Sequence, residues 1–510
     1  MMIAAMRVGV RDSAAAIGLD KRLVGVCAQE RVMRVRGGPT PGGVPDEALD
    51  LLLQRAGRTR GEICRMMQIG GGEPVVTAET VRLDDHFAHA CTAYLTSPFD
   101  RSAIVVCDHD TPSVSVWAGR DGTIAPVDLA WSGPGFSEAY TRCALALGFP
   151  RDTATQRFEA LARLRPDARD ARVDQLFDLD GDALRVDSTL EQVVAGLGGG
   201  AHAGNPRQRA ELAASLEARI VDLLVGFLER VRKRVALDNV CLGGSLFYHS
   251  SINTRVRSAG VFADAFVPID PGDAGVVAGA VLHGYGGRPE PASPFLGPAY
   301  SSEETKEVLD NCKLQYAWES ESAILADAVD SLMQGRLVAW FDAEMEWGPR
   351  SLGARSILAS PFSPYVLENL NRFLKHREPW RGYALSGLKE SVAAHFNGPA
   401  DAPFMEGDYR PLDAQGSLAE HVCAFARVGD GGVALTVVPR HLAKRRVDGP
   451  PVGPDYWGST WLTMPDDLGA RFRNVLTGEI LEVASTAEGR GLPLGSVLAN
   501  FPVALLENAP

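Results

Sequence analysis

At 510 residues the chain is long enough for roughly three domains, each with its own hydrophobic core. Charged residues make up 23% and hydrophobic residues 45%, as in an ordinary globular protein, and no apolar run reaches the length of a membrane span. The net charge of −13 argues against extended nucleic-acid binding, because a phosphate backbone needs a basic surface. The cysteines are scattered without a C-x-x-C pair and the chain opens without a secretory signal, so we expect a cytoplasmic protein with reduced thiols.

The first elements of the chain predict a strand, an acidic bend and a second strand. They span residues 7–28, with Asp12 at the bend. Residues 103–126 repeat this plan, with the bend at Asp108. Two copies of strand, acidic bend and strand indicate a duplicated fold. The pattern is typical of the actin-like ATPase fold, in which each half presents its acidic bend to a nucleotide and a metal ion.

Between the two copies, residues 84–90 predict a helix. Asp85 and His89 are four residues apart, so they share one face of this helix and are candidate ligands of a divalent metal. Asp108 follows an apolar strand, at the end where ligands collect in open α/β sheets, and is a candidate third ligand. Taken singly, such a His is more often a core residue and such an Asp a turn former. The metal interpretation gains weight from residues 266–275, where Asp273 follows a Gly/Pro turn at the head of a small-residue helix.

The region after the second copy is predicted to be helical at residues 208–236, on the spacing of its apolar residues. A strand at residues 239–243 follows, and Gly243 and Gly244 close it; glycines at such a turn let backbone amides approach a phosphate, although most Gly pairs only mark turns. A Gly- and Pro-rich linker at residues 286–300 marks a domain boundary.

The next region, residues 301–415, gathers basic residues in a chain that is acidic overall. Gly348 and Gly353 shape a loop that is followed by a cluster of arginines and one lysine. The cluster suits the recognition of phosphate or carboxylate, and a solvated face of paired charges is the alternative. Residues 416–510 contain short apolar segments between turn residues and predict a small antiparallel β domain.

These landmarks, in this order, resemble the NodU/CmcH-type O-carbamoyltransferases of antibiotic and nodulation-factor biosynthesis, over about residues 5–410. The most specific match is M-E-W-G-P-R-S-L-G-A-R-S-I-L-A at residues 345–359, beside the family's M-E-F-G-P-R-A-L-G-N-R-S-I-L-A. Residues 86–99 follow the family's H-H-x-x-H-A motif from its second His onward, and residues 242–244 and 271–275 fall at its Gly-Gly and G-D-x-G turns.

The resemblance implies an α/β protein of three domains. Residues 1–285 would form the actin-like carbamoyl-transfer domain, residues 301–415 a YrdC-like activation domain without the family's final N-T-S-F-N segment, and residues 416–510 the β domain. The activation domain would form carbamoyl adenylate from carbamoyl phosphate and ATP and release pyrophosphate. The actin-like domain, with bound iron, would pass the carbamoyl group to a hydroxyl of a small-molecule acceptor such as a natural product or a sugar.

Carried over position by position, the metal ligands would be His89, Asp108 and Asp273. Asp85 stands where the family has a ligating His, which makes the site harder, so Fe²⁺, Mg²⁺ and Mn²⁺ all stay open. The implied catalytic residues are Asp12 at the acidic bend, His86 as general base and Arg350 in the activation step. The implied nucleotide- and substrate-binding residues are Gly243, Gly244, Gly275, Glu346, Gly348, Arg350, Gly353, Arg355, Ser356, Lys375, Arg377 and Arg381.

Several departures from the family keep other functions open. An early family His becomes Arg11, and K-x-M-G-L-A becomes the sequence at residues 157–162. Residues 418–507 resemble instead the terminal β domain of maltooligosyltrehalose synthases, which suggests a structural cap or a carbohydrate acceptor. The alternatives are a degenerate relative that binds nucleotide or metal without transfer, and a sugar-kinase-like phosphotransferase. The sequence names neither the acceptor nor the oligomeric state.

Overall fold

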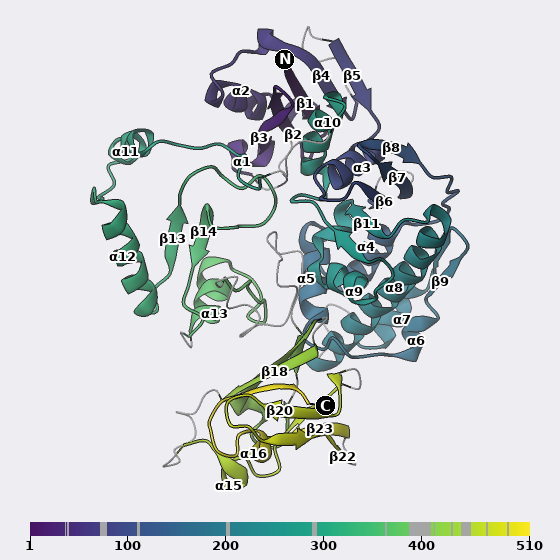
Figure 1. Ribbon diagram of the computed structural model, residues 1–510, viewed down its shortest axis with the longest axis vertical. Helices are drawn as coiled ribbons and strands as arrows, with labels where there is room; N and C mark the ends of the chain where they lie inside the picture. The colour runs from purple at the N-terminus through teal and green to yellow at the C-terminus, as the bar shows by residue number, and fades with distance from the viewer. Residues whose placement is uncertain are drawn as a thin grey trace. The chain divides into compact units, whose positions relative to one another are not determined.

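The computed structural model describes residues 1–509 except 36, 38–39, 72–78, 110–112, 200–204, 288–292, 363–364, 387–409, 413, 430–431, 440–449, 466–467 and 487–488. The chain divides into two compact units (Figure 1). Unit 1 comprises Met1–Ala160, Asp170–Asn205 and Leu216–Tyr383; unit 2 comprises Leu161–Arg169, Pro206–Ser215 and Ala384–Pro510. None of the described helices combines the length and the apolar character needed to cross a lipid bilayer.

The first sheet of unit 1 has the strand order β3-β2-β1-β4-β5. Its strands are β1 (Met2–Arg7), β2 (Ala14–Leu19), β3 (Arg22–Ala28), β4 (Ile63–Ile69) and β5 (Glu79–Leu83). The first three pair antiparallel, whereas β4 runs parallel to β1 and β5 parallel to β4. Helix α2 (Asp46–Arg55) covers one face and buries Leu49 and Leu52 against Met6 and Ile17 in a shared apolar core.

The second sheet repeats the first, with the order β8-β7-β6-β11-β12. Its strands are β6 (Arg101–Cys107), β7 (Val114–Arg120), β8 (Thr123–Pro126), β11 (Asn239–Gly243) and β12 (Asp264–Phe266). Again the first three pair antiparallel and the last two run parallel to the central strand. The predicted duplication is therefore confirmed: the structure is a mixed α/β fold with two sheets of actin-like order.

Two helices join the sheets. Helix α10 (Val276–Gly284) packs on β1, β2 and β4 of the first sheet, and helix α3 (Asp85–Leu95) packs on β6 and β11 of the second. The two helices also pack on each other, as Figure 1 shows. At their crossing the N–H of Gly279 donates a hydrogen bond of 3.0 Å to the Thr92 hydroxyl. A Cβ at Gly279 would overlap the backbone of Thr92, so only glycine permits this approach.

The substitution Gly279→Ala is expected to destabilise the protein by about 1–3 kcal/mol, because the added methyl group must force the two helices apart. The matched control is Gly226→Ala in helix α8 (Pro206–Val235), where an added Cβ would meet no atom within 4 Å. That control is expected to gain up to about 1 kcal/mol from the higher helix propensity of alanine. Chemical denaturation of both variants measures the difference, and equal effects of the two substitutions would refute the close-packing argument.

The remaining described helices of the second half include the predicted long helix, observed as α8 (Pro206–Val235). Its Phe227 ring packs against two other rings, with centroid distances of 5.3 Å to Trp131 and 5.9 Å to Phe136. The other elements are α1 (Gln29–Met33), α4 (Phe136–Ala146), α5 (Ala154–Ala162), α6 (Ala171–Asp174), β9 (Phe177–Asp180), β10 (Ala183–Val186), α7 (Leu190–Gly196) and α9 (Ser250–Ser258).

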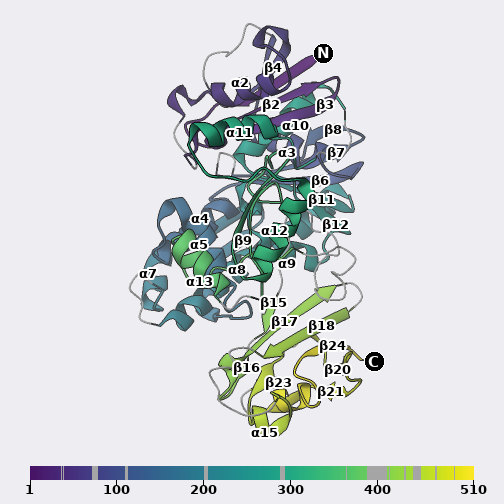
Figure 2. The ribbon, with the colours of Figure 1, turned by 90° about the vertical axis from the view of Figure 1, so that its left-hand side faces the viewer.

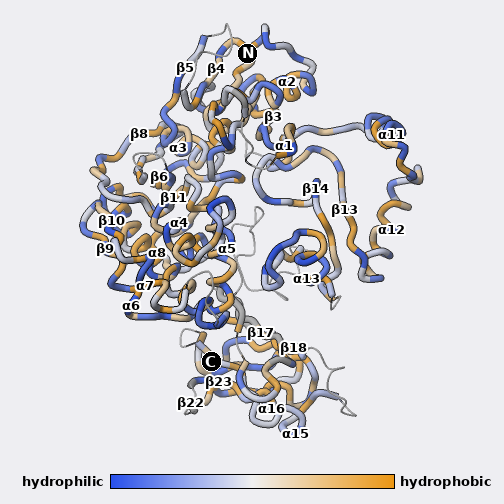
Figure 3. Tube along the Cα trace, turned by 180° about the vertical axis from the view of Figure 1, so that it is seen from behind, coloured by the Kyte–Doolittle hydropathy of each residue, from blue (hydrophilic) through white to orange (hydrophobic). Residues whose placement is uncertain are grey.

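Residues 301–383 of unit 1 form helices and a two-stranded antiparallel sheet. Helix α11 (Ser302–Asn311) begins with a capping box between Ser301 and Glu304, and Figure 3 shows it as largely hydrophilic. The other elements are α12 (Glu321–Met333), β13 (Val338–Phe341), β14 (Arg355–Leu358), α13 (Val366–Glu368) and a π-helix (Asn369–Leu374). The predicted linker and activation domain contain residues 288–292, 363–364, 387–409 and 413, which lie outside the described residues, so their assigned boundaries stay predictions.

Most of unit 2 is the predicted antiparallel β structure (Figure 2). One sheet has the order β15-β17-β18-β24-β20-β21 and the other β16-β19-β23-β22. Trp457, Leu462, Phe472 and Leu506 are fully buried in the core. The elements are β15 (Arg410–Leu412), β16 (Ala414–Gln415), β17 (Val422–Gly429), β18 (Gly432–Pro439), α15 (Gly453–Trp457), β19 (Trp461–Thr463), β20 (Arg471–Asn474), β21 (Ile480–Glu482), β22 (Ala484–Thr486), β23 (Gly489–Pro493), α16 (Leu494–Val497) and β24 (Ala504–Asn508).

Candidate metal centre

The site begins with helix α3, which starts where the sequence predicts it. Asp84 caps the helix, since its carboxylate accepts the N–H of Phe87 at 3.0 Å. Asp85 and His89 therefore lie one turn apart on the same face. The ring of His89 is buried, while the Asp85 side chain keeps 21% of its surface exposed. The helix thus presents a fixed imidazole and a carboxylate that solvent can reach.

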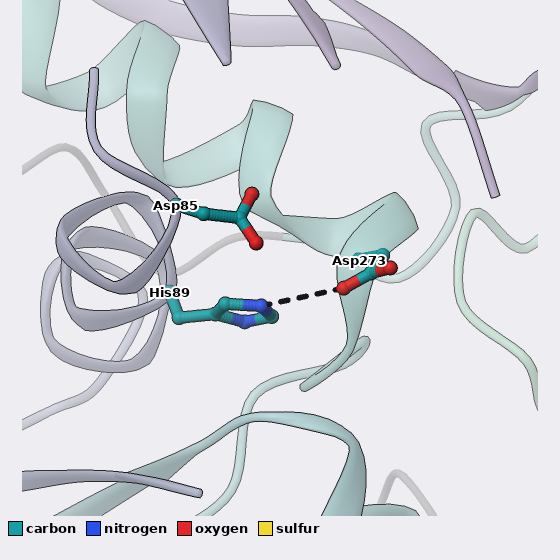
Figure 4. A group of neighbouring side chains, drawn as sticks. All are labelled: Asp85, His89 and Asp273. Carbon is teal, nitrogen blue, oxygen red and sulfur yellow. Dashed lines mark ion pairs between the residues drawn. The ribbon is translucent and has the colours of Figure 1, made fainter. Parts of the chain in front are cut away.

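Asp273 completes a cluster of three donor side chains (Figure 4). It lies at the head of α10, and one ligand atom from each of Asp85, His89 and Asp273 falls within 4.8 Å of the others. His89 Nε2 is 3.5 Å from Asp273 Oδ1 and 2.8 Å from Asp108 Oδ2. Three of the four residues that the sequence predicts as metal ligands therefore converge, and the fourth, Asp108, contacts the imidazole of His89.

His89 is held from behind by the main chain. Its Nδ1 lies 3.0 Å from the carbonyl oxygen of Pro271, which can only accept a hydrogen bond, so Nδ1 carries a proton and Nε2 faces the carboxylates. Burial favours the neutral ring, but the charges and hydrogen bonds of Asp108 and Asp273 raise the pKa of His89 well above its usual value. The raised pKa means that Nε2 is protonated as well, and a cation that binds Nε2 would displace the proton of Nε2.

Asp108 lies at the end of β6 and is buried. It accepts hydrogen bonds from the Ser245 hydroxyl at 2.6 Å and from the His109 N–H at 2.7 Å. Burial alone would favour the protonated carboxyl, but His89 and these donors hold the pKa of Asp108 below its usual range. Gly244 allows this arrangement, because its φ of 99° and its approach to the Cys107 carbonyl leave no room for a Cβ.

Asp270 lies three residues before Asp273, and no sequence pattern marks it as a site residue. It is buried and accepts hydrogen bonds from the Tyr248 hydroxyl at 2.6 Å and from the Gly272 N–H at 3.1 Å. Burial is the main cause that raises the pKa of Asp270 to about 7. Gly275 packs so close to the Asp270 carbonyl that a Cβ would overlap it.

The raised pKa of Asp270 predicts a pH-dependent loss of stability. Between pH 3.8 and about 7 the unfolded chain releases the proton that the folded chain keeps, so the free energy of unfolding falls as pH rises and levels off above pH 7. The loss amounts to up to about 4 kcal/mol, at about 1.4 kcal/mol per pKa unit. Asp270→Asn, which keeps Oδ1 as an acceptor, is therefore expected to be more stable than the unchanged protein at pH 8 and not at pH 4. Urea titrations with EDTA at both pH values check this, and a gain of equal size at both would contradict it.

Arg7 is the site residue that the sequence analysis missed. It ends β1, and its Nη2 lies 2.6 Å from Asp273 Oδ2 while its Nε lies 3.7 Å from Asp85 Oδ1. Only 11% of its side-chain surface is exposed. A single arginine at the carboxyl end of an otherwise apolar strand, Met-Ile-Ala-Ala-Met-Arg, is the sequence feature that could have revealed it.

The two other predicted catalytic residues of the actin-like half lie beside this cluster. His86 is buried, its ring centroid is 6.4 Å from that of His89, and its Nδ1 is 2.7 Å from the Ser115 hydroxyl. Asp12 occupies the predicted bend with a φ of 54°. Partial removal from water, followed by the charge of Asp273, raises the pKa of Asp12.

The arginine-rich loop predicted from residues 344–356 is folded around Glu346. Its Oε1 accepts the backbone N–H groups of Leu352, Ala354 and Arg355 at 2.7, 2.8 and 3.2 Å. Arg355 itself donates to main-chain carbonyls of Asp342, Ala343 and Ala354, and its guanidinium lies 3.6 Å above the Phe341 ring centre. Ser356 Oγ accepts the Gly353 N–H at 3.0 Å.

This loop contacts Tyr248 and Ile269, which lie beside the candidate metal centre. Arg350 donates to the carbonyl oxygen of Tyr248 at 2.6 Å, and the Tyr248 hydroxyl binds Asp270. Gly348 lies against the carbonyl of Ile269, where a Cβ would not fit, and its own carbonyl accepts from Arg31 at 3.3 Å. The loop at residues 344–356 therefore contacts residues 248 and 269, and Tyr248 links it to Asp270.

The basic residues that follow the loop include Arg377 and Arg381, which contact residues of the segment 371–383. Arg377 donates to Asn371 at 2.8 Å and lies 4.4 Å from the centre of the Tyr383 ring. Arg381 lies 4.0 Å from Glu378, and Lys375 is exposed. The structure thus brings Asp85, His89, Asp108 and Asp273 together with Arg350 nearby, and it gives Arg377 and Arg381 partners within residues 371–383.

Two family models match the chain. The model described as the carbamoyltransferase N-terminus matches residues 74–282, and the one described as the carbamoyltransferase C-terminus matches residues 329–428, so together they match more than half of the chain. The chain belongs to the carbamoyltransferase family. The first match contains Asp85, His89, Asp108 and Asp273, and the second contains the loop at residues 344–356.

Among curated proteins, the chain is similar to nodulation proteins and to uncharacterized proteins. It is 30% identical to nodulation protein NolO of Bradyrhizobium diazoefficiens over 240 residues, which cover 44% of this chain and 43% of NolO. It is 27% identical to the uncharacterized protein sll1178 of Synechocystis over 352 residues, or 63% of this chain and 57% of that protein. The chain thus spans about half the length of the curated relatives it matches.

Among solved structures, the chain resembles the activator of the 2-hydroxyisocaproyl-CoA dehydratase from Clostridium difficile with bound ADPNP. The identity is 13% and the TM-score 0.37, with 62% of this chain and all of that chain covered.

Proposed function

We propose that this chain transfers a carbamoyl group from an activated donor to a hydroxyl group of a small-molecule acceptor. The observation that supports this most is the meeting of Asp85, His89, Asp108 and Asp273 in a chain of the carbamoyltransferase family. The donor set, one imidazole nitrogen and several carboxylate oxygens, fits a small divalent cation such as Fe²⁺, Mn²⁺ or Mg²⁺. When bound, such a cation would stabilise the negative charge that grows on the carbamoyl oxygen.

The residues of the chain itself supply the remaining functions. His86 would accept the proton of the acceptor hydroxyl through Nε2, since its Nδ1 faces Ser115. The hydroxyl oxygen would form a bond to the carbamoyl carbon as the bond from that carbon to the phosphate oxygen breaks. Asp12, at the bend beside the cluster, would orient the acceptor through its carboxylate.

We assign the activation step to the YrdC-like region that begins at residue 301. There, water would cleave carbamoyl phosphate to carbamate and inorganic phosphate, and a carbamate oxygen would attack the α-phosphorus of ATP, which gives carbamoyl adenylate and releases pyrophosphate. Arg350 would keep the loop at residues 344–356 against Tyr248, so that the activated donor forms next to the acceptor site. Gly243, Gly244 and Gly275 would let backbone amides approach the donor phosphate.

The test is an isotope-exchange assay followed by a transfer assay. The purified protein is incubated with carbamoyl phosphate, ATP and labelled pyrophosphate, and the label that appears in ATP is counted. A panel of hydroxylated acceptors, sugars among them, is then screened by mass spectrometry for a gain of one carbamoyl group. Exchange together with a carbamoylated product supports the proposal.

One observation favours the alternative of a degenerate relative that binds nucleotide without transfer. The guanidinium groups of Arg350 and Arg355 already donate to main-chain carbonyls. Absence of exchange in protein that still binds ATP would support this alternative. Release of ADP that depends on the acceptor would instead indicate a phosphotransferase.

A further inference from the structure

The carboxylates of the candidate metal centre already have a cationic partner in the chain. Arg7 Nη2 contacts Asp273 Oδ2 at 2.6 Å and Arg7 Nε lies 3.7 Å from Asp85 Oδ1. Asp85 and Asp273 are two of the three residues whose ligand atoms converge within 4.8 Å. One guanidinium therefore spans two of the three groups that a metal ion would need.

The Arg7 side chain is fixed from its other end as well. Its Nη1 donates to the carbonyl oxygen of Arg11 at 3.1 Å, and a Cβ at Gly9 would lie 2.7 Å from Nη1. Only 11% of the side-chain surface is exposed, so water cannot replace these contacts without a large cost in free energy. The Arg7 side chain is thus a fixed part of the site.

A divalent cation and the Arg7 guanidinium cannot both bind the carboxylate oxygens of Asp85 and Asp273 at full strength. Two positive charges within a few ångströms repel each other, and Asp273 Oδ2 cannot serve both partners at full strength. At the same time, Asp85 and Asp273 would repel each other if neither cation were present. The site therefore needs one cation at any time, and the fold provides one.

We propose that Arg7 is a resident cation that competes with the metal for Asp85 and Asp273, so that metal enters only as the guanidinium withdraws from Asp273. The proposal rests on the metal-binding role given to this cluster above. It makes Arg7 a residue that sets metal affinity, because it weakens the binding of every divalent ion and keeps the proposed ligands together when no metal is present.

The experiment measures Mn²⁺ binding alone, by calorimetry and by the electron paramagnetic resonance of free Mn²⁺, after dialysis against EDTA. The variant Arg7→Gln removes the charge and is expected to bind Mn²⁺ at least about tenfold more tightly, because a charge pair a few ångströms apart near a protein surface is worth several kcal/mol. Arg7→Lys keeps the charge and is expected to bind Mn²⁺ as weakly as the unchanged protein. The matched control is Arg60→Gln, which also removes an arginine that pairs with two carboxylates, Asp46 and Asp50, each at 2.6 Å.

Thermal melting with and without Mn²⁺ provides a second measurement, which applies even if Arg7→Gln is less stable than the unchanged protein. Without metal this variant is expected to melt below the unchanged protein, and Mn²⁺ is expected to raise its melting temperature by more than it raises that of the unchanged protein or of Arg60→Gln. Equal or weaker Mn²⁺ binding by Arg7→Gln would overturn the proposal, as would tighter binding by Arg60→Gln. Tight Mn²⁺ binding without any carbamoyl transfer would leave the proposal standing and count against the proposed function.

Discussion

Replacement of Asp273 by Asn is expected to lower carbamoyl transfer by at least about a hundredfold and to leave pyrophosphate exchange intact. Asp273 Oδ1 faces His89 and its Oδ2 holds Arg7, so one neutralised carboxylate removes a ligand and frees the guanidinium. The side chain is 27% exposed at the head of α10, so the change should cost little stability. Transfer is measured as carbamoylated product per minute, at saturating donor.

The control for this prediction is Asp46→Asn. Asp46 also pairs with an arginine at 2.6 Å and lies in the same unit, on α2. We expect its transfer rate to equal that of the unchanged protein. Asp273→Asn with a normal transfer rate would show that the cluster does not carry the chemistry.

The variant Arg350→Ala has the opposite expected profile: pyrophosphate exchange falls by about a hundredfold or more. The Arg350 guanidinium holds the loop at residues 344–356 to the Tyr248 carbonyl, and its loss should release this loop from the wall formed by residues 269–270. Exchange of label into ATP is the measurement. Transfer from pre-formed carbamoyl adenylate is expected to fall much less, because Asp85 and His89 on α3 and Asp273 before α10 are unchanged.

Arg372→Ala provides the comparison for Arg350→Ala. Arg372 belongs to the same basic cluster, but 70% of its side-chain surface is exposed and it pairs only locally with Glu368 at 3.1 Å. We expect exchange by this variant to be unchanged, since exposed ion pairs contribute little. If both variants lost exchange equally, the overall basic charge and not the docking of Arg350 would be responsible.

The sequence predicted the parts of this structure that local patterns encode. Strand, acidic bend and strand recur at Asp12 and Asp108, and both sheets have the same order. The four-residue spacing of Asp85 and His89 placed both on one face of a helix, and the cap at Asp84 begins that helix. The turn before Asp273 was recognised from its Gly and Pro residues. These predictions succeeded because each depends on a few neighbouring residues.

The sequence did not reveal what depends on side-chain direction between distant segments. Arg7 and Asp270 escaped notice because a single charged residue next to an apolar strand has no periodicity to mark it. The arginine-rich loop was expected to present its guanidinium groups to phosphate, and the structure shows Arg350 and Arg355 bound to carbonyls of the main chain. Which of two possible partners an arginine chooses is decided by tertiary contacts.

The crossing of α3 and α10 at Thr92 and Gly279 has a consequence for movement between the two sheets. Helix α3 carries Asp85 and His89 on one side of the crossing, and α10 begins just after Asp273 on the other. A slide of one helix along the other by a single turn, about 5.4 Å, is longer than the 4.8 Å that encloses the three ligand atoms. Such a slip would separate Asp85 and His89 from Asp273, so the cluster can form in only one registry of the two helices, and an ion proposed to bind there would be lost on a one-turn shear.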